Sequence, residues 1–262
     1  MPFDLHGPRS VVLDVDGVLW IGGAPGKGAI AFLDSLAREG IPFCLLTNTC
    51  TVSKAILHKS LTQAGFTLQA EQLVTATEVT RDWLRDAAAH TIMYLGTPSA
   101  LLDLTEGMSV CEIVPVDAVV VGDLFAHFDR GKLNRAAKAV NAGATLVAMQ
   151  RNPHWSDGTD WYVDNGFWVA GLEFVTGQQA VVTGKPHRAA YQSALARLGQ
   201  TADASSSTIF VSDDMAVDLK GAKDVGLTTV HFGPAHILPP WVDYSVRDFS
   251  SLARLLIGNR DE

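Results

Sequence analysis

Two carboxylates two residues apart follow a short apolar run near the start of the chain. Asp14 and Asp16 stand at the end of residues 11–15, whose other side chains are Val and Leu, a pattern typical of a buried strand. In an extended backbone both acids project to the same side, and the Asp16-Gly17 turn signal ends the strand. Alone, such a pair is most often a solvated turn. A buried pair of acids needs a cation, a proton or hydrogen bonds to offset its cost.

Three further predicted strands end in polar groups. Each group stands within two residues of the end of an apolar run. Thr47 follows residues 41–46, Lys185 follows residues 180–183, and Asp213, with Asp214 and Asp218 just beyond, follows residues 208–211. Taken singly, a Thr or a Ser-Asp-Asp run is explained as a helix cap, and a Lys before Pro as a solvated side chain. In an open parallel sheet, however, ligands bind beyond the carboxyl ends of the strands. We therefore expect the four strand ends to meet at one site.

The chemistry that fits these groups is phosphoryl transfer. Several acids at one point call for a hard cation, and oxygen ligands beside a phosphate favour Mg²⁺. A carboxylate can also serve as the nucleophile and form an aspartyl-phosphate. A phosphate monoester is anionic, so a metal ion, Lys185 and the Thr47 hydroxyl must offset the repulsion from the carboxylates.

The elements that must position these residues alternate along the chain. Apolar runs alternate with helical patterns and glycine or proline stops, which predicts an α/β fold with a parallel sheet and right-handed crossovers. Thr77 is expected to cap a helix over residues 78–89, and a further helix is expected over residues 218–224. Residues 151–166 are polar and aromatic, which predicts a long loop or hairpin of the kind that lines substrate pockets.

Composition narrows the class of protein. The 262 residues are 47% hydrophobic and 18% charged, enough for one large domain or two modest ones with a sizeable core. The net charge of −8 argues against nucleic acid and anionic membranes as partners. No signal peptide or membrane-spanning run is recognisable, and Cys44, Cys50 and Cys111 are not spaced as a metal site. We expect a cytoplasmic protein with reduced thiols, in which Cys50 is a bystander.

The polar motifs resemble those of a known superfamily. Residues 14–19, Thr47-Asn48, Gly184-Lys185-Pro186 and Asp213-Asp214 with Asp218 resemble the four motifs of the haloacid dehalogenase-like (HAD) hydrolases. Their order and spacing are similar to subclass IIA, which includes the N-acetylglucosamine-phosphatase-like proteins and the phospholysine phosphohistidine inorganic pyrophosphate phosphatase. The resemblance implies an α/β fold: a Rossmann-like parallel-sheet core over residues 1–78 and 180–262, with an inserted α/β cap domain of the C2 type over residues 79–179.

The resemblance also implies a role for each matched side chain. Asp14 would be the nucleophile that becomes phosphorylated. Asp16 would protonate the leaving alcohol and then deprotonate the attacking water. Thr47 and Asn48 would hold the phosphoryl oxygens, and Lys185 would neutralise the phosphate and orient Asp14.

The implied cofactor is Mg²⁺. Its ligands would be Asp14, the backbone carbonyl of Asp16, and Asp213, and Asp218 would act through water. The chain departs from the family at Ser212, where the fourth motif usually has Gly. A serine is tolerable at a strand end, but it would crowd the metal loop. The second motif also continues with an unusual Thr-Cys-Thr over residues 49–51.

The cap would carry the substrate specificity. Asp164, Asn165 and Gly166 are the residues that we expect in a loop facing the core site, and the partner would be a small phosphorylated metabolite. Relatives often dimerise through the cap, so a homodimer through the cap is the expected assembly if the chain is not a monomer.

The predicted function is Mg²⁺-dependent hydrolysis of a small phosphomonoester through an aspartyl-phosphate. A phosphotransferase or phosphomutase with the same intermediate remains an alternative, and so does a phosphate-ligand sensor without turnover. A dehalogenase is disfavoured, because that chemistry has no leaving alcohol to protonate and therefore no use for the second acid, Asp16.

Overall fold

The chain folds into two compact units. The computed structural model describes residues 10–124, 129–156, 159–200, 206–235 and 237–258. The first unit consists of Met1–Thr47, His58–Val74 and Ala190–Glu262, and the second of Asn48–Leu57 and Thr75–Ala189. Each unit contains its own parallel sheet, so the α/β class predicted from the sequence is confirmed. The division into a core and a cap at residues 78/79 and 179/180 stays a prediction.

The first unit is built on a six-stranded sheet with the order β15-β14-β13-β1-β4-β5. Its strands are β1 (Ser10–Asp14), β4 (Phe43–Thr47), β5 (Leu73–Thr75), β13 (Thr208–Ser212), β14 (Thr228–Phe232) and β15 (Tyr244–Val246). Every residue of β1, β4 and β13 is buried, as expected for central strands that are covered on both faces. Because β1, β4 and β13 are neighbours and parallel, their carboxyl ends meet at one edge of the sheet.

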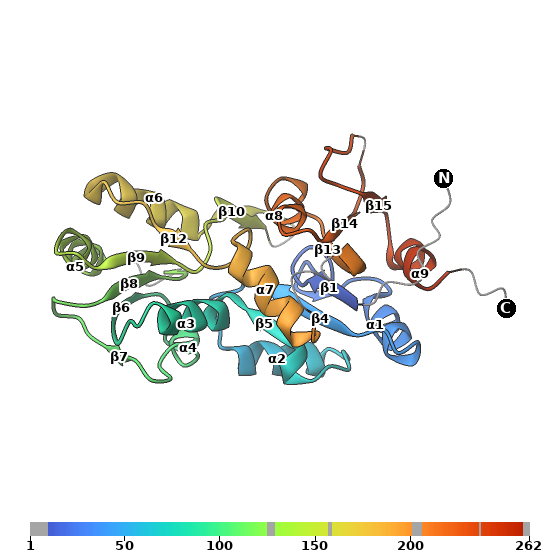
Figure 1. Cartoon of the computed structure of the whole chain (residues 1–262), viewed down its shortest axis with the longest axis horizontal. Helices are drawn as coiled ribbons and strands as arrows, with labels where there is room; N and C mark the ends of the chain where they lie inside the picture. Colours follow the sequence, from blue (N-terminus) through green and yellow to red (C-terminus); the bar gives the residue numbers. More distant parts are fainter. Residues whose placement is uncertain (1–9, 125–128, 157–158, 201–205, 236, 259–262) are drawn as a thin grey trace. The chain divides into compact units, whose positions relative to one another are not determined.

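Helices cover both faces of this sheet. The helices and helical turns of this part of the chain are α1 (Ala29–Arg38), α2 (Lys54–Gln63), η1 (Ala70–Gln72), α7 (Arg188–Arg197), η4 (Met215–Leu219), α8 (Lys220–Asp224) and α9 (Phe249–Ile257). On the face covered by α7 (Figure 1), Tyr191 of that helix packs edge-on against Phe210 of β13, with ring centroids 5.4 Å apart. On the other face, Phe249 of α9 lies 4.6 Å from the Phe232 ring of β14 and 5.2 Å from the Phe32 ring of α1. A short hairpin, β2 (Trp20–Ile21) with β3 (Ala24–Pro25), follows β1.

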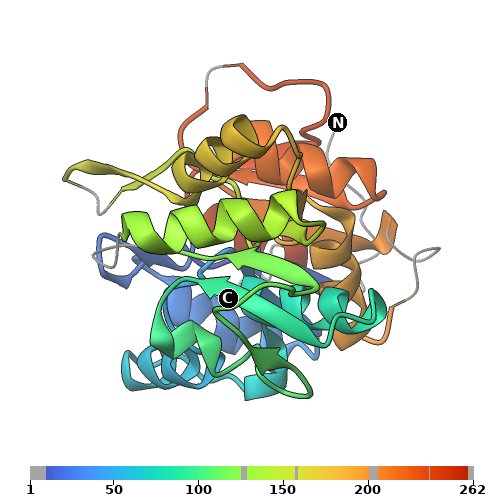
Figure 2. The same ribbon diagram turned by 90° about the vertical axis from the view of Figure 1, so that its left-hand side faces the viewer.

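The second unit contains a five-stranded parallel sheet with the order β12-β9-β8-β6-β7. Its strands are β6 (Thr91–Leu95), β7 (Ser109–Val110), β8 (Ala118–Val121), β9 (Thr145–Ala148) and β12 (Val181–Val182). Alternate side chains of β8 pack into two hydrophobic cores, one on each face of the sheet. Val119 and Val121 face α5 (Arg130–Asn141) and α6 (Asn165–Thr176). Ala118 and Val120 face α3 (Ala76–Asp86) and α4 (Pro98–Leu101). Figure 2 shows α5 and α6 side by side on their face of the sheet. The aromatic segment forms the predicted hairpin, β10 (His154–Ser156) with β11 (Trp161–Val163).

One expectation about strand grouping is wrong. Residues 180–183 were expected beside the strands that carry Asp14, Thr47 and Asp213, but β12 pairs with β9 in the second sheet, Val181 opposite Val147. The apolar pattern of a strand predicts the strand but not its neighbour, because sheet pairing depends on contacts between residues far apart in sequence.

Two helix starts also differ from the prediction. Helix α3 begins at Ala76, because the Thr75 hydroxyl accepts a hydrogen bond from the Glu78 N–H and makes Thr75, not Thr77, the N-cap. Helix α8 begins at Lys220, because residues 215–219 first form a π-helical turn.

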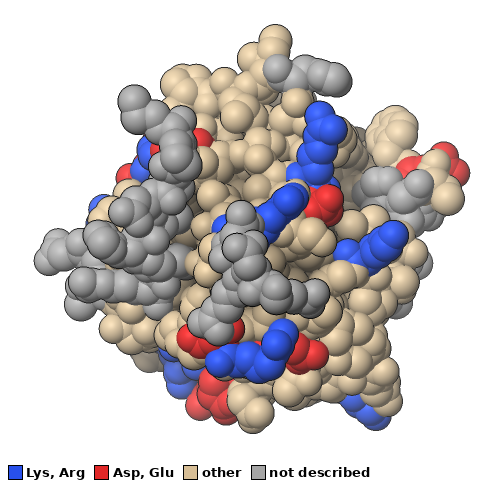
Figure 3. Space-filling view, turned by 90° about the vertical axis from the view of Figure 1, so that its right-hand side faces the viewer, with Lys and Arg blue, Asp and Glu red and all other residues tan. Residues whose placement is uncertain are grey.

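Charged side chains of both signs are interspersed on the molecular face drawn in Figure 3. In the part of that face that the structure describes, Lys and Arg lie among Asp and Glu instead of gathering into a basic stripe. No helix in the described ranges is both long and apolar enough to cross a bilayer.

Asp243 ties together the end of α8 and the start of β14. Its carboxylate accepts hydrogen bonds from Lys223 Nζ at 2.6 and 2.8 Å and from the Thr229 N–H at 2.9 Å. Burial alone would raise the pKa of Asp243, but these hydrogen bonds outweigh it and hold the pKa below its ordinary value. A lowered folded-state pKa stabilises the fold above the unfolded pKa, and this contribution is lost as pH falls through the folded pKa.

We predict that Asp243→Asn lowers the free energy of unfolding at pH 7 by about 1.5–2 kcal/mol, the lower part of the range for hydrogen bonds to a charged group, because Lys223 is partly exposed. The difference from wild type should shrink as the pH falls below about 4, because the unfolded chain then takes up a proton on Asp243 that the folded protein takes up only at lower pH. Urea unfolding at pH 7 and pH 3 measures both. Asp224→Asn, at an exposed position of α8, is the control and should change little. An equal difference at both pH values would contradict the assigned role of the charge.

Candidate active site

The first acid pair lies at the end of β1 and in the loop after it. Asp14 is the last residue of β1 and is 6% exposed, and its Oδ1 accepts a hydrogen bond from the Val15 N–H at 2.8 Å. Asp16 is exposed, because the strand has already ended and the chain turns there. Gly17 has φ +82°, a conformation that suits glycine, and its N–H bonds to the Trp20 carbonyl at 2.9 Å. The local turn therefore places one carboxylate inside the protein and the other at the surface.

Thr47 lies beside this pair. Asp14 is in register with Leu46 of β4, so Thr47, the last residue of β4, stands one position beyond Asp14. The Thr47 hydroxyl donates a hydrogen bond to Asp16 Oδ2 at 3.3 Å. The structure thus brings the second motif to the first through neighbouring strands of one sheet.

The fourth motif completes this cluster from β13. Leu13 pairs with Val211, which makes Asp14 and Ser212 neighbours across the two strands. The Ser212 hydroxyl lies 3.2 Å from Asp14 Oδ2 and 3.1 Å from Asp218 Oδ2. Asp213 lies against Gly17: a Cβ atom added to Gly17 would overlap the Asp213 carboxylate, closer than Cβ atoms come in proteins. Glycine at position 17 is therefore required for this approach as well as for the turn.

The turn that carries Asp218 is anchored on several sides. The Asp214 carboxylate caps η4 by accepting hydrogen bonds from the Ala216 and Val217 N–H groups, both at 2.9 Å. Tyr191 Oη donates to the Asp218 carbonyl at 2.8 Å. Burial, and then the nearby Asp218 and Asp14 carboxylates, raise the pKa of Tyr191, so the phenol stays protonated as a donor.

The third motif and Asn48 form a separate pair in the second unit. Asn48 Oδ1 accepts a hydrogen bond from the Lys185 N–H at 2.8 Å, and Asn48 Nδ2 donates to the Lys185 carbonyl at 3.0 Å. Lys185 is 2% exposed. The Asn48 side chain thus fixes the backbone of Lys185, a contact that spacing along the sequence did not indicate. A joint site of Lys185 with Asp14 remains a prediction, because the two residues belong to different units.

The three expected specificity residues do not lie in a loop, because Asp164 is the N-cap of α6 and Asn165 and Gly166 are its first residues. Their contacts hold α6 to the ends of the second sheet. Asp164 caps α6 and accepts a hydrogen bond from Gln150 Nε2 at 2.7 Å. Asn165 is fully buried, and its Nδ2 donates to the Val121 and Gln150 carbonyls at 3.1 and 2.9 Å. Gly166 stands so close to the backbone of residues 151 and 152 that a side chain would not fit. Contact of these residues with a substrate stays a prediction.

Buried polar side chains surround Asp164, and of these only Cys50 was named from the sequence. Burial raises the pKa of the Asp164 carboxyl, and burial together with the Asp164 and Asp123 carboxylates raises the pKa of the Cys50 thiol. A protonated, buried thiol is a poor nucleophile. The signal for Gln150 was available in the sequence, since it is a polar residue directly after the apolar residues 146–149, as Thr47 is after residues 41–46.

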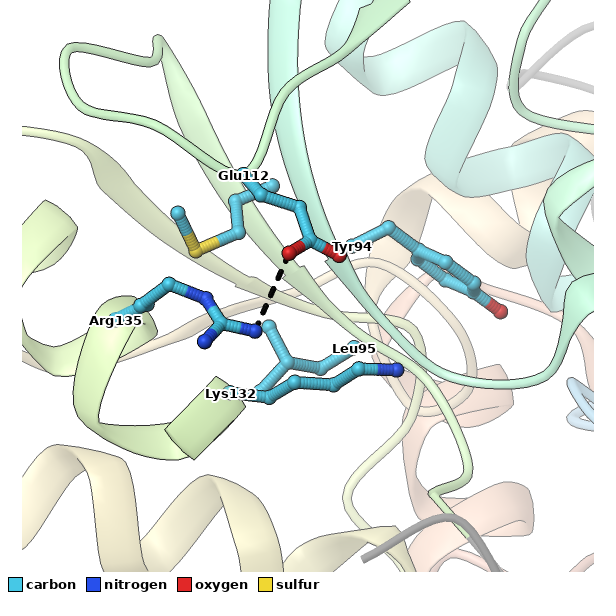
Figure 4. A pocket seen from close by; sticks show the side chains of 6 residues that line it. Tyr94, Leu95, Glu112, Lys132 and Arg135 are labelled. Carbon is cyan, nitrogen blue, oxygen red and sulfur yellow. Dashed lines mark ion pairs between the residues drawn. The ribbon is translucent and has the colours of Figure 1, made fainter. Parts of the chain in front are cut away.

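A separate hollow in the second unit contains none of the expected site residues. Figure 4 shows its lining, in which Arg135 pairs with Glu112 at 3.3 Å and the Tyr94 ring points away from Arg135. Its other lining residues are Met93, Leu95 and Lys132. The hollow lacks grouped carboxylates, so we do not assign it to catalysis.

The donor set in the first unit fits a hard divalent cation. Within the described ranges, no three His, Cys, Asp or Glu side chains form a ready metal cluster. The expected ligand set requires only two carboxylates, from Asp14 and Asp213, with the Asp16 carbonyl as the third oxygen. Because the Asp213 carboxylate lies on the Gly17 backbone, it is held next to the loop that provides this carbonyl. Oxygen donors of this kind suit Mg²⁺.

Family models match both ends of the chain. The model described as haloacid dehalogenase-like hydrolase matches residues 11–108, and the one described as HAD-hydrolase-like matches residues 182–232. Together they cover more than half of the chain and include all four motifs.

Individual proteins match over most of their length. The ribonucleotide monophosphatase NagD of Escherichia coli is 26% identical over 223 residues, 85% of this chain and 86% of that protein. The phospholysine phosphohistidine inorganic pyrophosphate phosphatase of Rattus norvegicus is 26% identical over 231 residues, 85% and 82% of the two chains. The glycerol phosphate phosphatase of Mycobacterium tuberculosis, solved with calcium, superposes with a TM-score of 0.82 at 27% identity, over 93% of this chain and 74% of that one. Its structure with magnesium matches at 26% identity.

We predict that Gly17→Ala weakens divalent-cation binding at least about tenfold, because the added methyl group must displace the Asp213 carboxylate. Gly23→Ala is a matched control: Gly23 has the same φ of +82°, but nothing lies within 4 Å of its added Cβ. Both variants should lose about 1–2 kcal/mol of stability from backbone strain. Titration calorimetry with Mg²⁺ and thermal unfolding separate the two effects. Equal cation affinity of the two variants would count against the assigned place of Asp213.

Proposed function

Because the chain belongs to the haloacid dehalogenase-like hydrolases and is a hydrolase of phosphate esters, we propose that it hydrolyses a small phosphomonoester through an aspartyl-phosphate on Asp14. The observation that supports this most is the meeting of Asp14, Asp16, Thr47 and Asp213 at the ends of three neighbouring strands. A carboxylate nucleophile beside a second carboxyl group that can give and take a proton supplies the two groups that such a two-step reaction uses.

The first step transfers the phosphoryl group to the protein. A carboxylate oxygen of Asp14 attacks phosphorus, and the bond between phosphorus and the alcohol oxygen breaks. Asp16 gives its proton to the departing oxygen, and the Thr47 hydroxyl orients the Asp16 carboxyl for this transfer. In the second step water attacks phosphorus, Asp16 takes a proton from that water, and Asp14 leaves as a free carboxylate with inorganic phosphate as product.

Positive charge must accompany the phosphate. Asp14, Asp213 and the Asp16 carbonyl would hold Mg²⁺, which when bound offsets the repulsion between the carboxylates and the phosphoryl oxygens. In our proposal Lys185 adds a second positive charge and orients Asp14. Asn48 keeps Lys185 in place through the two backbone hydrogen bonds, which supports a positioning role in addition to the expected contact with phosphoryl oxygens.

The remaining proposals concern substrate, assembly and location. We infer a small phosphorylated metabolite as substrate, with specificity provided by a cap over residues 79–179 and its Asp164-Asn165-Gly166 segment. Dimerisation through the cap is the proposed assembly, and it is supported by the exposed aromatic side chains of Trp161 and Phe174 in the second unit. A cytoplasmic location agrees with three cysteines that form no disulfide.

Phosphate release from a panel of phosphomonoesters and pyrophosphate, with Mg²⁺ and with a chelator, tests the proposed function. We expect release that depends on the metal and is concentrated on one or a few compounds. Asp14→Asn should abolish release, by at least about a thousandfold, since an amide cannot form the acyl phosphate, while circular dichroism shows an intact fold. Substantial remaining activity in this variant would exclude Asp14 as the nucleophile. Transfer to a second substrate instead of water would indicate a phosphotransferase, and cation binding without turnover a sensor.

We predict that Asp16→Asn slows the hydrolysis of substrates with poor leaving groups most. An alkyl phosphate needs a proton on the departing oxygen, whereas 4-nitrophenol departs readily without one. We expect a loss of about a hundredfold or more for alkyl phosphates, within the usual contribution of general acid catalysis, and a much smaller loss in single-turnover phosphorylation by 4-nitrophenyl phosphate. Equal slowing of both substrates would show that Asp16 is not the general acid.

A further inference from the structure

The side chain that departs from the family pattern lies between two of the site's carboxylates. Ser212 is fully buried at the end of β13. Its hydroxyl lies 3.2 Å from Asp14 Oδ2 and 3.1 Å from Asp218 Oδ2, and it accepts a hydrogen bond from the Asp214 N–H at 3.1 Å. A glycine at this position would supply none of these contacts.

One hydroxyl has one proton but two acceptors in reach. The Asp214 N–H occupies a lone pair of Ser212 Oγ, so the hydroxyl proton is directed away from that N–H and toward the carboxylates. At any moment the hydroxyl donates one full hydrogen bond to either Asp14 or Asp218, or two weaker hydrogen bonds to both. Two carboxylates that both lie within 3.2 Å of one hydroxyl oxygen repel each other. A donor that they share lowers the free-energy cost of burying both.

The same hydroxyl fixes the orientation of Asp14. Asp14 Oδ1 is held by the Val15 N–H at 2.8 Å, and Oδ2 by Ser212. With at least one donor on each oxygen, the plane of the carboxylate is defined. Asp218 is held in place as the alternative acceptor. Tyr191 Oη donates a hydrogen bond to its backbone carbonyl at 2.8 Å, which anchors η4 beside Ser212.

We propose that Ser212 is a positioning residue, which holds Asp14 in its attacking orientation and redirects its hydrogen bond to Asp218 when Asp14 takes another partner. The inference deepens the proposed function, on which it rests for the role of Asp14. Since the buried hydroxyl always retains one acceptor, Asp14 can exchange partners without leaving an orphaned donor behind.

Four variants distinguish the hydrogen bond that Ser212 donates from the packing of its side chain. Ser212→Ala removes the donor, and Ser212→Cys keeps a side chain of similar size with only a weak donor. Ser212→Thr keeps the hydroxyl. Ser10→Ala is the matched control, because Ser10 is an equally buried serine on β1 that bonds Thr208 of β13 at 2.8 Å at the other end of the same strand pair.

We expect Ser212→Ala and Ser212→Cys to lower kcat about tenfold with KM changed less than about twofold, as for a lost orienting hydrogen bond. Ser212→Thr should stay within about threefold of wild type, and Ser10→Ala should lose stability but not kcat. A kcat for both Ala and Cys variants within about twofold of wild type would overturn the inference, and so would an equal loss of kcat in Ser10→Ala. Thermal unfolding shows whether each variant is folded. If Ser212→Ala does not fold, the kcat of Ser212→Cys decides whether the inference holds.

A Mg²⁺ titration without substrate keeps the two proposals distinguishable. Removing a donor from Asp14 leaves a stronger ligand, so Ser212→Ala should bind Mg²⁺ about fivefold more tightly than wild type while it turns over more slowly. If wild type releases phosphate from no compound, the proposed function fails and this titration alone tests Ser212. In that case the same Kd in both proteins, or no binding to either, overturns the inference.

Discussion

Repulsion between carboxylates of like charge is the constraint on which this site depends. Asp14 and Asp218 are buried, and both reach the Ser212 hydroxyl at the ends of β1 and β13. Left alone, such a group would either take up protons or push its members apart. Each acid is instead held by a donor: Asp14 by the Val15 N–H, Asp16 by the Thr47 hydroxyl, and Asp214 by the first N–H groups of η4. These donors balance part of the negative charge, and the rest is available for a cation and for the chemistry.

The parallel sheet explains why hydrogen-bond donors and acidic side chains lie at the same edge of the sheet. In β1, β4 and β13 the strands are buried throughout, so polar residues are tolerated only where the strands end. Register then fixes which ends are neighbours, because Asp14 stands beside Leu46 on one side and Ser212 on the other. The loop after β1 could not close on Asp213 with any residue larger than Gly17. Local geometry and sheet register together thus set the distances between the acids.

The sequence predicted what depends on local pattern. The α/β class follows from alternating apolar runs and helical patterns, such as the apolar stripe of α1, which Gly28 and Gly40 flank. It could not predict partners that depend on pairing between distant segments. The strand before Lys185 has the same apolar pattern as the strand before Asp213, yet it joins the second sheet. The reciprocal hydrogen bonds of Asn48 with the Lys185 backbone link residues 137 positions apart, and no motif records them.

The departure at Ser212 shows how a family pattern and a structure answer different questions. Judged by the pattern, the serine is a larger residue where glycine is usual, and the expected effect is crowding of the metal loop. In the structure its hydroxyl connects three carboxyl-bearing residues through one proton and one lone pair. The added atoms therefore supply a donor at the point of greatest negative charge, which offsets repulsion that a glycine would leave to solvent or a cation. Whether a substitution disturbs such a site depends on the hydrogen bonds that it adds as much as on the volume that it occupies.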